Sequence, residues 1–183
     1  VIISVALSVA LFFILPQLLT SLISPYIKSS LLTNLIEGAV RLMIFLGYLL
    51  LCTAVKDVRR VFMYHGAEHK TIFCYEAGLP LTVENARTMP RLHPRCGTSF
   101  LVFVMVISIV LFSFISWDNM LTRLGLRLLL LPVVAGLSYE IIRWAGRSQN
   151  IIVRIISKPG MWIQKITTRE PDDSQLEVAI ASM

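Results

Sequence analysis

Residues 31–55 read LLTNLIEGAVRLMIFLGYLLLCTAV, and within this run only Glu37 and Arg41 ionise. A helix that crosses a bilayer needs about 20 consecutive, mainly apolar residues, and this run is long enough. Glu37 and Arg41 are four residues apart, so a helix brings them to one face, where they can neutralise each other. We therefore predict a transmembrane helix whose ionised pair faces protein instead of lipid.

Three further runs of the chain share this character. They cover residues 1–23, 97–117 and 121–144, with Pro16 inside the first and Trp117 at the end of the second. Pro16 predicts a kink, and Trp117 lies where an aromatic side chain would anchor a span at the membrane interface. The predicted fold class is all-α: a polytopic integral membrane helical bundle with about four transmembrane helices.

Composition agrees with this fold class. The chain has 183 residues, of which 56% are hydrophobic and 15% charged. Soluble domains average about 25% charged residues, so this chain has too little polar surface to cover a globule in water. A soluble enzyme, a disordered tail and a nucleic-acid-binding domain are therefore excluded. The three cysteines, Cys52, Cys74 and Cys96, are odd in number and show no spacing typical of a disulfide framework.

The runs divide the chain into four predicted segments. These are transmembrane helices 1 and 2, a cytoplasmic helical loop, transmembrane helices 3 and 4, and a cytoplasmic amphipathic tail, at residues 1–55, 56–96, 97–145 and 146–183. Within the tail, apolar and basic residues alternate over 151–166, as in a helix that lies in the membrane interface. We expect Pro159 and Gly160 to break that helix, and a second helix to start near Pro171.

Basic residues predict the orientation of the chain. Residues 55–96 hold seven Lys or Arg and residues 143–169 hold six, whereas the connector 24–30 holds only Lys28. Short loops rich in Lys and Arg remain in the cytoplasm. We therefore place residues 56–96 and the C-terminus there, and we interpret the net charge of +6 as an orientation signal that implies no nucleic-acid partner.

All three histidines of the chain lie in the predicted 56–96 loop. His65 and His69 belong to an H-x-x-E-H string, and residues i and i+4 of a helix lie on one face, one turn apart. Two such imidazoles are typical ligands of zinc or another divalent transition metal. Glu68, rotated away from the ligand face, can act as the general base that activates water.

A catalytic zinc site usually has three protein ligands and one open position. Glu76 lies on the same helical stripe but about 10 Å along the axis from His69, which is too far for a metal bond. The string His93-Pro-Arg-Cys96 offers two donors, of which His93 is our first choice and Cys96 the second. The alternative interpretation is that the histidines are polar groups at the membrane interface and Cys96 is a buried thiol.

Four strings in order resemble a known family. They are Tyr64-His-Gly-Ala-Glu-His-Lys-Thr71, Leu81-Thr-Val-Glu84, His93-Pro-Arg-Cys-Gly-Thr-Ser-Phe100 and Thr167-Thr-Arg-Glu-Pro-Asp-Asp173. Together they are similar to the YqhQ family of bacterial membrane proteins, whose function is unknown and for which a metal dependence is expected. The resemblance implies the bacterial inner membrane. The family pattern also includes a glycine-containing N-terminal segment before the first span, which this sequence lacks. The tail string suggests that Asp172 or Asp173 folds back to orient a histidine.

Two functions remain open from the sequence. The first is a zinc-dependent hydrolase at the cytoplasmic membrane face, such as a protease for membrane substrates, with Glu68 as base. The second is a non-enzymatic membrane factor whose structural metal holds the 56–96 loop for a protein partner in membrane-protein assembly or quality control. If His93 and Cys96 both join His65 and His69, the site is closed and favours the second function. The sequence indicates neither the substrate nor the oligomeric state.

Overall fold

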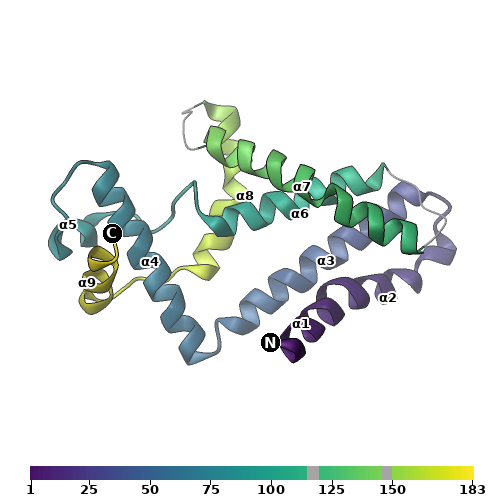
Figure 1. The fold of residues 1–183 in the computed structure, drawn as a ribbon, viewed down its shortest axis with the longest axis horizontal. Coiled ribbons are helices and arrows are strands. Elements are labelled where there is room, and N and C mark those ends of the chain that lie inside the picture. The colour runs from purple at the N-terminus through teal and green to yellow at the C-terminus, as the bar shows by residue number, and fades with distance from the viewer. Residues whose placement is uncertain (115–119, 146–149) are drawn as a thin grey trace. The chain divides into compact units, whose positions relative to one another are not determined.

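A computed structural model describes residues 1–114, 120–145 and 150–183, and within these ranges the chain is helical without strands (Figure 1). The helices are α1 Ile2–Val9, α2 Leu15–Ser21, α3 Ser30–Cys52, α4 Lys56–Glu76, α5 Val83–Thr88, α6 Gly97–Ser113, α7 Met120–Ala145, α8 Ile151–Thr167 and α9 Asp173–Ala181. A π-helical turn, Ala10–Ile14, joins α1 to α2, and a short 3-10 turn, Ser24–Tyr26, follows α2. The all-α prediction is confirmed for these residues.

Within the described residues, three helical stretches are long and apolar enough to cross a membrane: Ile2–Ser21, Ser30–Cys52 and Leu128–Ala145. This agrees with the predicted helical membrane protein. The apolar helix α6 has 17 residues and extends about 26 Å at 1.5 Å per residue, less than a typical hydrocarbon core. The fourth span therefore stays a prediction, and Trp117 lies outside the described residues.

One compact unit contains residues 1–48 and 102–141. Its N-terminal helix departs from α-helical geometry just before Pro16, where we predicted a kink. Pro16 has no N–H for the carbonyl of Phe12 four residues earlier, and the Arg41 Nε donates to that carbonyl oxygen instead, at 3.0 Å. Arg41 also pairs with the buried Glu37 at 2.7 Å, so the predicted ion pair is confirmed and faces protein.

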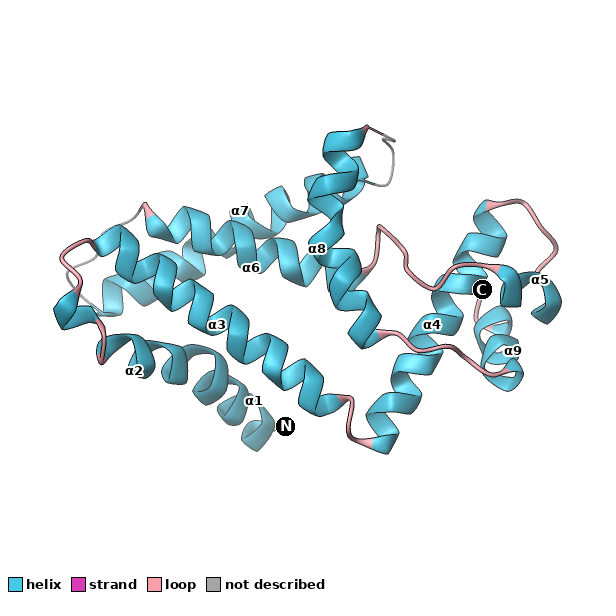
Figure 2. Cartoon of the chain, turned by 180° about the vertical axis from the view of Figure 1, so that it is seen from behind, coloured by secondary structure: helices cyan, strands magenta, loops and turns pink. Residues whose placement is uncertain are grey.

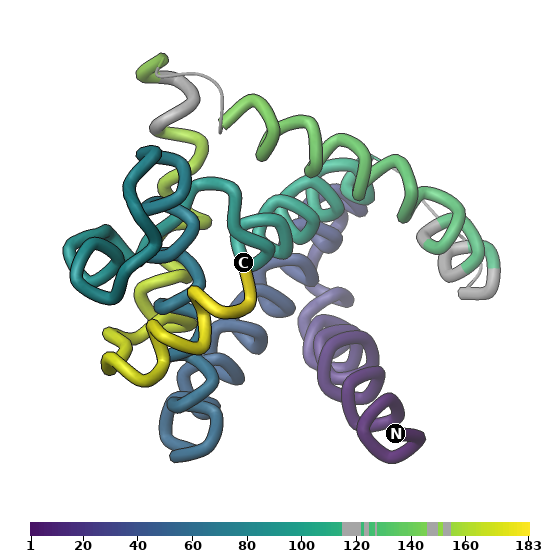
Figure 3. Tube along the Cα trace, turned by 60° about the vertical axis from the view of Figure 1, so that its left-hand side comes forward, coloured from purple at the N-terminus to yellow at the C-terminus, as the bar shows by residue number. Residues whose placement is uncertain are grey.

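The other unit contains residues 49–101 and 142–183. Here α4 packs with α5 and α9, as Figures 2 and 3 show from two sides. Their shared core consists of Ala67, Cys74, Ala86, Leu176 and Ala179. Helix α4 ends at Glu76, and Gly78 just beyond it has a φ of 68° and donates its N–H to the carbonyl of Tyr75. Cys74 is thus a packing residue of this core.

Helix α8 corrects one prediction. It continues through Pro159 and Gly160, where we expected a break. Gly160 instead lies against Ser99 of α6, because a Cβ at Gly160 would come within 2.6 Å of the Ser99 Oγ. The glycine therefore permits close helix packing, and the exposed Pro159 lies on the other side. Apolar side chains such as Ile155 and Trp162 are exposed on α8, as expected of an amphipathic helix.

Candidate metal centre

Helix α4 brings His65 and His69 together. One helical turn separates them, and their ring centroids lie 4.4 Å apart, as the H-x-x-E-H spacing predicts. His69 is 3% exposed and His65 is half-buried. The two imidazoles therefore form one edge of a buried polar site.

Cys96 supplies a third donor from a different segment. It directly precedes α6, and the N–H of Thr98 donates to its sulfur at 3.4 Å. The thiol is 7% exposed, and its Sγ lies 3.1 Å from the Nε2 of His65. One donor atom from each of His65, His69 and Cys96 lies within 4.8 Å of the other two. Three such donors match the usual protein ligands of a catalytic zinc.

Backbone carbonyls set the orientation of both histidines. The Nδ1 of His65 donates to the carbonyl oxygen of Thr167 at 2.9 Å, and the Nδ1 of His69 donates to that of Arg91 at 2.6 Å. A carbonyl oxygen only accepts, so each Nδ1 carries a proton and each Nε2 is left for a ligand. Metal-binding histidines in proteins are typically held in this way.

The charge state of Cys96 also suits a metal. Burial alone would raise the pKa of its thiol, but hydrogen bonds with His65, His69 and Thr98 lower this pKa to about 5. The pKa of His65 is raised, because its contacts with Cys96 and the Thr167 carbonyl outweigh the effect of burial. Thiolate is the form of cysteine that binds metals, so the sulfur is ready to coordinate at neutral pH.

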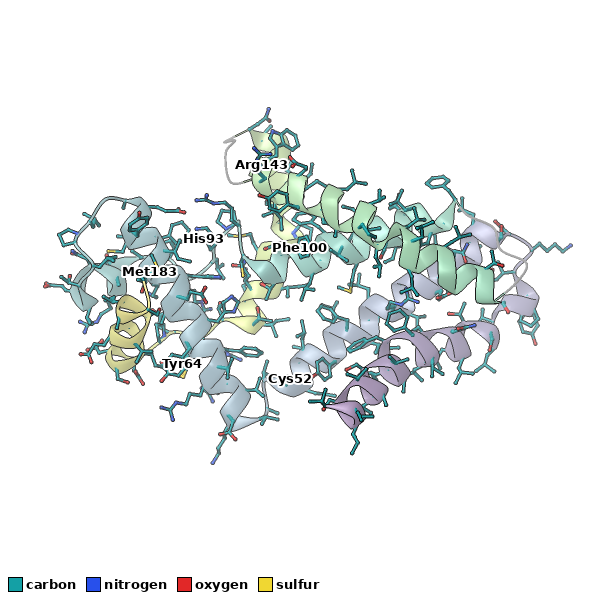
Figure 4. The ribbon with its side chains drawn as sticks, in the orientation of Figure 1. Cys52, Tyr64, His93, Phe100, Arg143 and Met183 are labelled. Carbon is teal, nitrogen blue, oxygen red and sulfur yellow. The ribbon has the colours of Figure 1, made fainter. Side chains whose placement is uncertain are left out.

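His93, which Figure 4 labels, has its ring centroid 5.8 Å from that of His69 but makes other contacts. Its Nδ1 accepts the N–H of Arg95 at 3.2 Å, and its buried Nε2 lies 3.5 Å from the Oε2 of Glu76. Burial lowers the pKa of His93, and the nearby Glu76 carboxylate only partly opposes this effect. A neutral ring that accepts at Nδ1 carries its proton on Nε2. Coordination by either ring nitrogen would displace the Arg95 N–H from Nδ1, and the ligand role of His93 stays a prediction.

Glu76 and Glu68 both line the cleft next to the three donors. The cleft has a volume of about 560 Å³, and its walls include His65, His69, Cys96, His93, Arg95 and Leu101. Both carboxylates are exposed, but Glu76 forms an ion pair with Arg95 and lies 3.5 Å from the Nε2 of His93. A second cavity of about 410 Å³, lined partly by α9, shares His65 and Glu68 with the first. Glu68 is thus an exposed carboxylate beside the donors, whereas the carboxylate of Glu76 is engaged by Arg95.

Residues 167–173, the tail string, hold the site in place through contacts with helix α4. The N–H of Arg169 donates to the Phe62 carbonyl at 2.8 Å, and a Cβ at Gly66 would collide with the carbonyl oxygen of Arg169. Glu170 pairs with the buried Lys70 at 2.5 Å. Because the backbone of Arg169 packs directly against Gly66, the carbonyl of Thr167 lies close enough to accept the hydrogen bond of His65.

We expected Asp172 or Asp173 to contact a histidine, but both aspartates have other partners. Asp172 caps α9 through the N–H of Gln175, and Asp173 forms two hydrogen bonds with Arg87. The tail does orient a histidine, but through the Thr167 carbonyl, so the proposed role of Asp172 or Asp173 is wrong. The capping box of Asp172 and Gln175 confirms the predicted start of a helix after Pro171.

Sequence reasoning missed the groups that hold the donors. The orienting carbonyls of Thr167 and Arg91 leave no residue-type signal, because every residue has a carbonyl. Gln164, fully buried in α8, hydrogen bonds to the backbone of His93 and was also missed. Gly66 did carry a signal, since a glycine inside a helix costs about 1 kcal/mol relative to alanine and usually has a packing reason.

Comparison with known proteins matches this chain along its whole length. The profile of a family described as "Protein of unknown function (DUF1385)" matches residues 1–183. The chain is 38% identical over 172 residues to "Uncharacterized protein YqhQ" of Bacillus subtilis (strain 168), a match that covers 93% of the chain and 54% of that protein. The chain thus spans about half the length of this relative, and no solved structure matches it. The predicted resemblance is confirmed: the chain is similar to YqhQ, and it belongs to the DUF1385 family.

Proposed function

We propose that the chain binds zinc or another divalent transition metal through His65, His69 and Cys96 and uses it for hydrolysis at the cytoplasmic face of the membrane. The main support is the convergence of three donor atoms within 4.8 Å of one another. Two of these donors have their tautomers held by backbone carbonyls. We do not include His93, because both of its ring nitrogens face other groups.

The cleft favours an open site with room for a substrate. When bound, the metal would supply Lewis-acid activation of a water molecule and of a substrate carbonyl. Glu68 lines the same cleft and is exposed, so it can take a proton from that water and pass it to the leaving group. Apolar side chains such as Ile72 and Leu101 also line the cleft and can contact apolar parts of a substrate. A protein or peptide segment near the bilayer is the substrate class that we propose.

Metal analysis of the purified chain in lipid nanodiscs tests the site. After loading with Co²⁺ and removal of free ion, we expect one equivalent of metal and a thiolate-to-cobalt charge-transfer absorption. His65→Ala and Cys96→Ser should each weaken binding by about 10-fold or more, because each removes a donor. Cys52→Ser is the matched control and should bind as the unchanged chain does. Absence of stoichiometric cobalt from the loaded chain would overturn the proposal.

A second measurement separates the hydrolase from a structural metal site that holds the 56–96 loop for a protein partner. Azide should change the cobalt spectrum of an open site and leave that of a closed, four-ligand site unchanged. Glu68→Gln should keep the metal but abolish cleavage of a quenched fluorescent peptide library, with a loss of at least about 100-fold for a general base. A spectrum insensitive to azide, with no effect of Glu68→Gln, would favour the structural role.

The location proposed with this function is the bacterial inner membrane. The seven basic residues at 55–96 and the six at 143–169 support a cytoplasmic position of both segments. Both contribute to the unit that contains the three donors. The site would then act on substrates that it meets at the inner membrane surface.

A further inference from the structure

Gln164 makes three hydrogen bonds to the segment that leads to Cys96. Its Oε1 accepts the N–H of His93 at 2.7 Å, and its Nε2 donates to the carbonyl of His93 at 2.7 Å and to the Ser99 Oγ at 2.8 Å. The side chain is fully buried, with an exposed fraction of 0%. A buried amide is costly unless its groups are paired, so these contacts are tightly specified.

These hydrogen bonds restrain the backbone turn that runs from His93 to Cys96. Gln164 contacts both the N–H and the carbonyl of His93, which restrains the position and the rotation of that residue. The same carbonyl accepts the N–H of Cys96 at 3.3 Å and so closes the turn that carries the thiol. Ser99 then follows in the first turn of α6. Gln164 therefore contacts the chain on both sides of Cys96.

The same face of α8 also reaches the other half of the site. Gly160, one turn before Gln164, lies against Ser99, and Thr167, nearly one turn after it, accepts the hydrogen bond of His65. One helix thereby contacts both the segment with the thiol and the helix with the imidazoles. Gln164 is the fully buried polar side chain that joins these two contacts along the same face of the helix.

We propose that Gln164 is a positioning residue that fixes the Sγ of Cys96 relative to His65 and His69. The inference rests on the proposed metal site and assigns part of its geometry to α8. Gln164 acts through the backbone of His93 and has no contact of its own with the donors. Its loss should therefore affect the thiolate contribution more than the two histidines, which α4 carries and the carbonyls of Thr167 and Arg91 orient.

The test compares Gln164→Met, which keeps the volume but removes the hydrogen bonds, with Thr168→Val as control. Thr168 is equally buried in the same tail, but its hydroxyl bonds only to the Gln164 carbonyl within the local backbone. We expect Gln164→Met to weaken Co²⁺ binding by about 10–100-fold, as removal of an outer partner of a metal ligand typically does. The thiolate-to-cobalt absorption should weaken as well, and Thr168→Val should change neither.

A metal-free readout distinguishes failure of this inference from failure of the metal site. In the metal-free chain, the pH midpoint of Cys96 alkylation, followed by mass spectrometry, should rise by about one unit or more in Gln164→Met, because the sulfur leaves its hydrogen-bond partners. An unchanged midpoint would overturn the positioning role, whatever the metal result. If the methionine variant does not fold, Gln164→Glu keeps the acceptor for His93 and is judged by the same midpoint.

Discussion

Gly66 shows how one residue links the tail to the histidines. It lies inside the H-x-x-E-H string, between His65 and Ala67, and the backbone of Arg169 passes directly over it. The contact is backbone to backbone, so neither side can rotate away to make room for a larger residue. The missing side chain is therefore required by packing.

Gly66→Ala should destabilise the second unit by about 1–3 kcal/mol, the usual cost of overpacking where the neighbour cannot yield. The Thr167 carbonyl should also move away from His65 and weaken Co²⁺ binding. Gly47→Ala is the matched control, because Gly47 lies in helix α3 with nothing within 4 Å of an added Cβ. Thermal unfolding in nanodiscs measures the difference. Equal melting temperatures for the two variants would contradict the close passage.

Cys96 and His93 illustrate how similar donors are separated by their surroundings. The sequence places both in one string, and we preferred His93 as the third ligand. Tertiary contacts with Glu76 and Arg95 engage the His93 ring, whereas the start of α6 brings Cys96 to His65. Loss of the thiolate-to-cobalt absorption in Cys96→Ser would identify Cys96 as a ligand.

At the scale of elements, α8 has two faces with different tasks. Its exposed face carries Ile155, Trp162 and Lys165, a pattern suited to the membrane interface. Its buried face carries Gly160, Gln164 and Thr167, which contact the metal-site segments. Alternation of apolar and basic residues predicted the first face, and the second became visible only through its contacts.

Helix α9 provides a prediction with a pH dependence. Asp172 caps it, and hydrogen bonds from the Ser174 hydroxyl and the Gln175 N–H lower the pKa of this carboxyl below its usual 3.8. A lowered pKa in the folded chain stabilises the helix above the ordinary pKa, and this contribution is lost as the pH falls through the folded pKa. The cap is therefore complete at pH 7.

Asp172→Ala should expose the first turn of α9 at pH 7, so amide exchange of residues 173–176 should approach that of an open loop. Asp172→Asn, which keeps an acceptor of equal capping strength, should protect these amides as Asp172 does. In the unchanged chain the same protection should decline only below about pH 3.8. Protection in the alanine variant equal to that of the unchanged chain would argue against the cap. Hydrogen exchange with mass spectrometry makes the comparison.

At the scale of the whole molecule, the distribution of charge predicts which side each segment occupies. If α6 crosses the membrane as a fourth span, the 24–30 connector lies outside and the 56–96 loop lies inside with the tail. Tyr26→Cys and Ser182→Cys, each in a chain without other cysteines, test this in right-side-out vesicles. A maleimide that cannot cross the membrane should label the first variant fully and the second only after permeabilisation. Labelling of both from one side would contradict the four-span topology.

Local periodicity alone establishes the helical membrane class, the Glu37–Arg41 pair and the shared face of His65 and His69. Each of these depends on residues about one helical turn apart, which a sequence displays directly. Folding decides what lies next to them. His65 meets the carbonyl of Thr167, 102 residues away, and Cys96 joins it from 31 residues away. Such contacts depend on how α4, α6 and α8 pack. Every residue has a backbone carbonyl, so the residue types in the sequence do not show which carbonyl will contact a histidine.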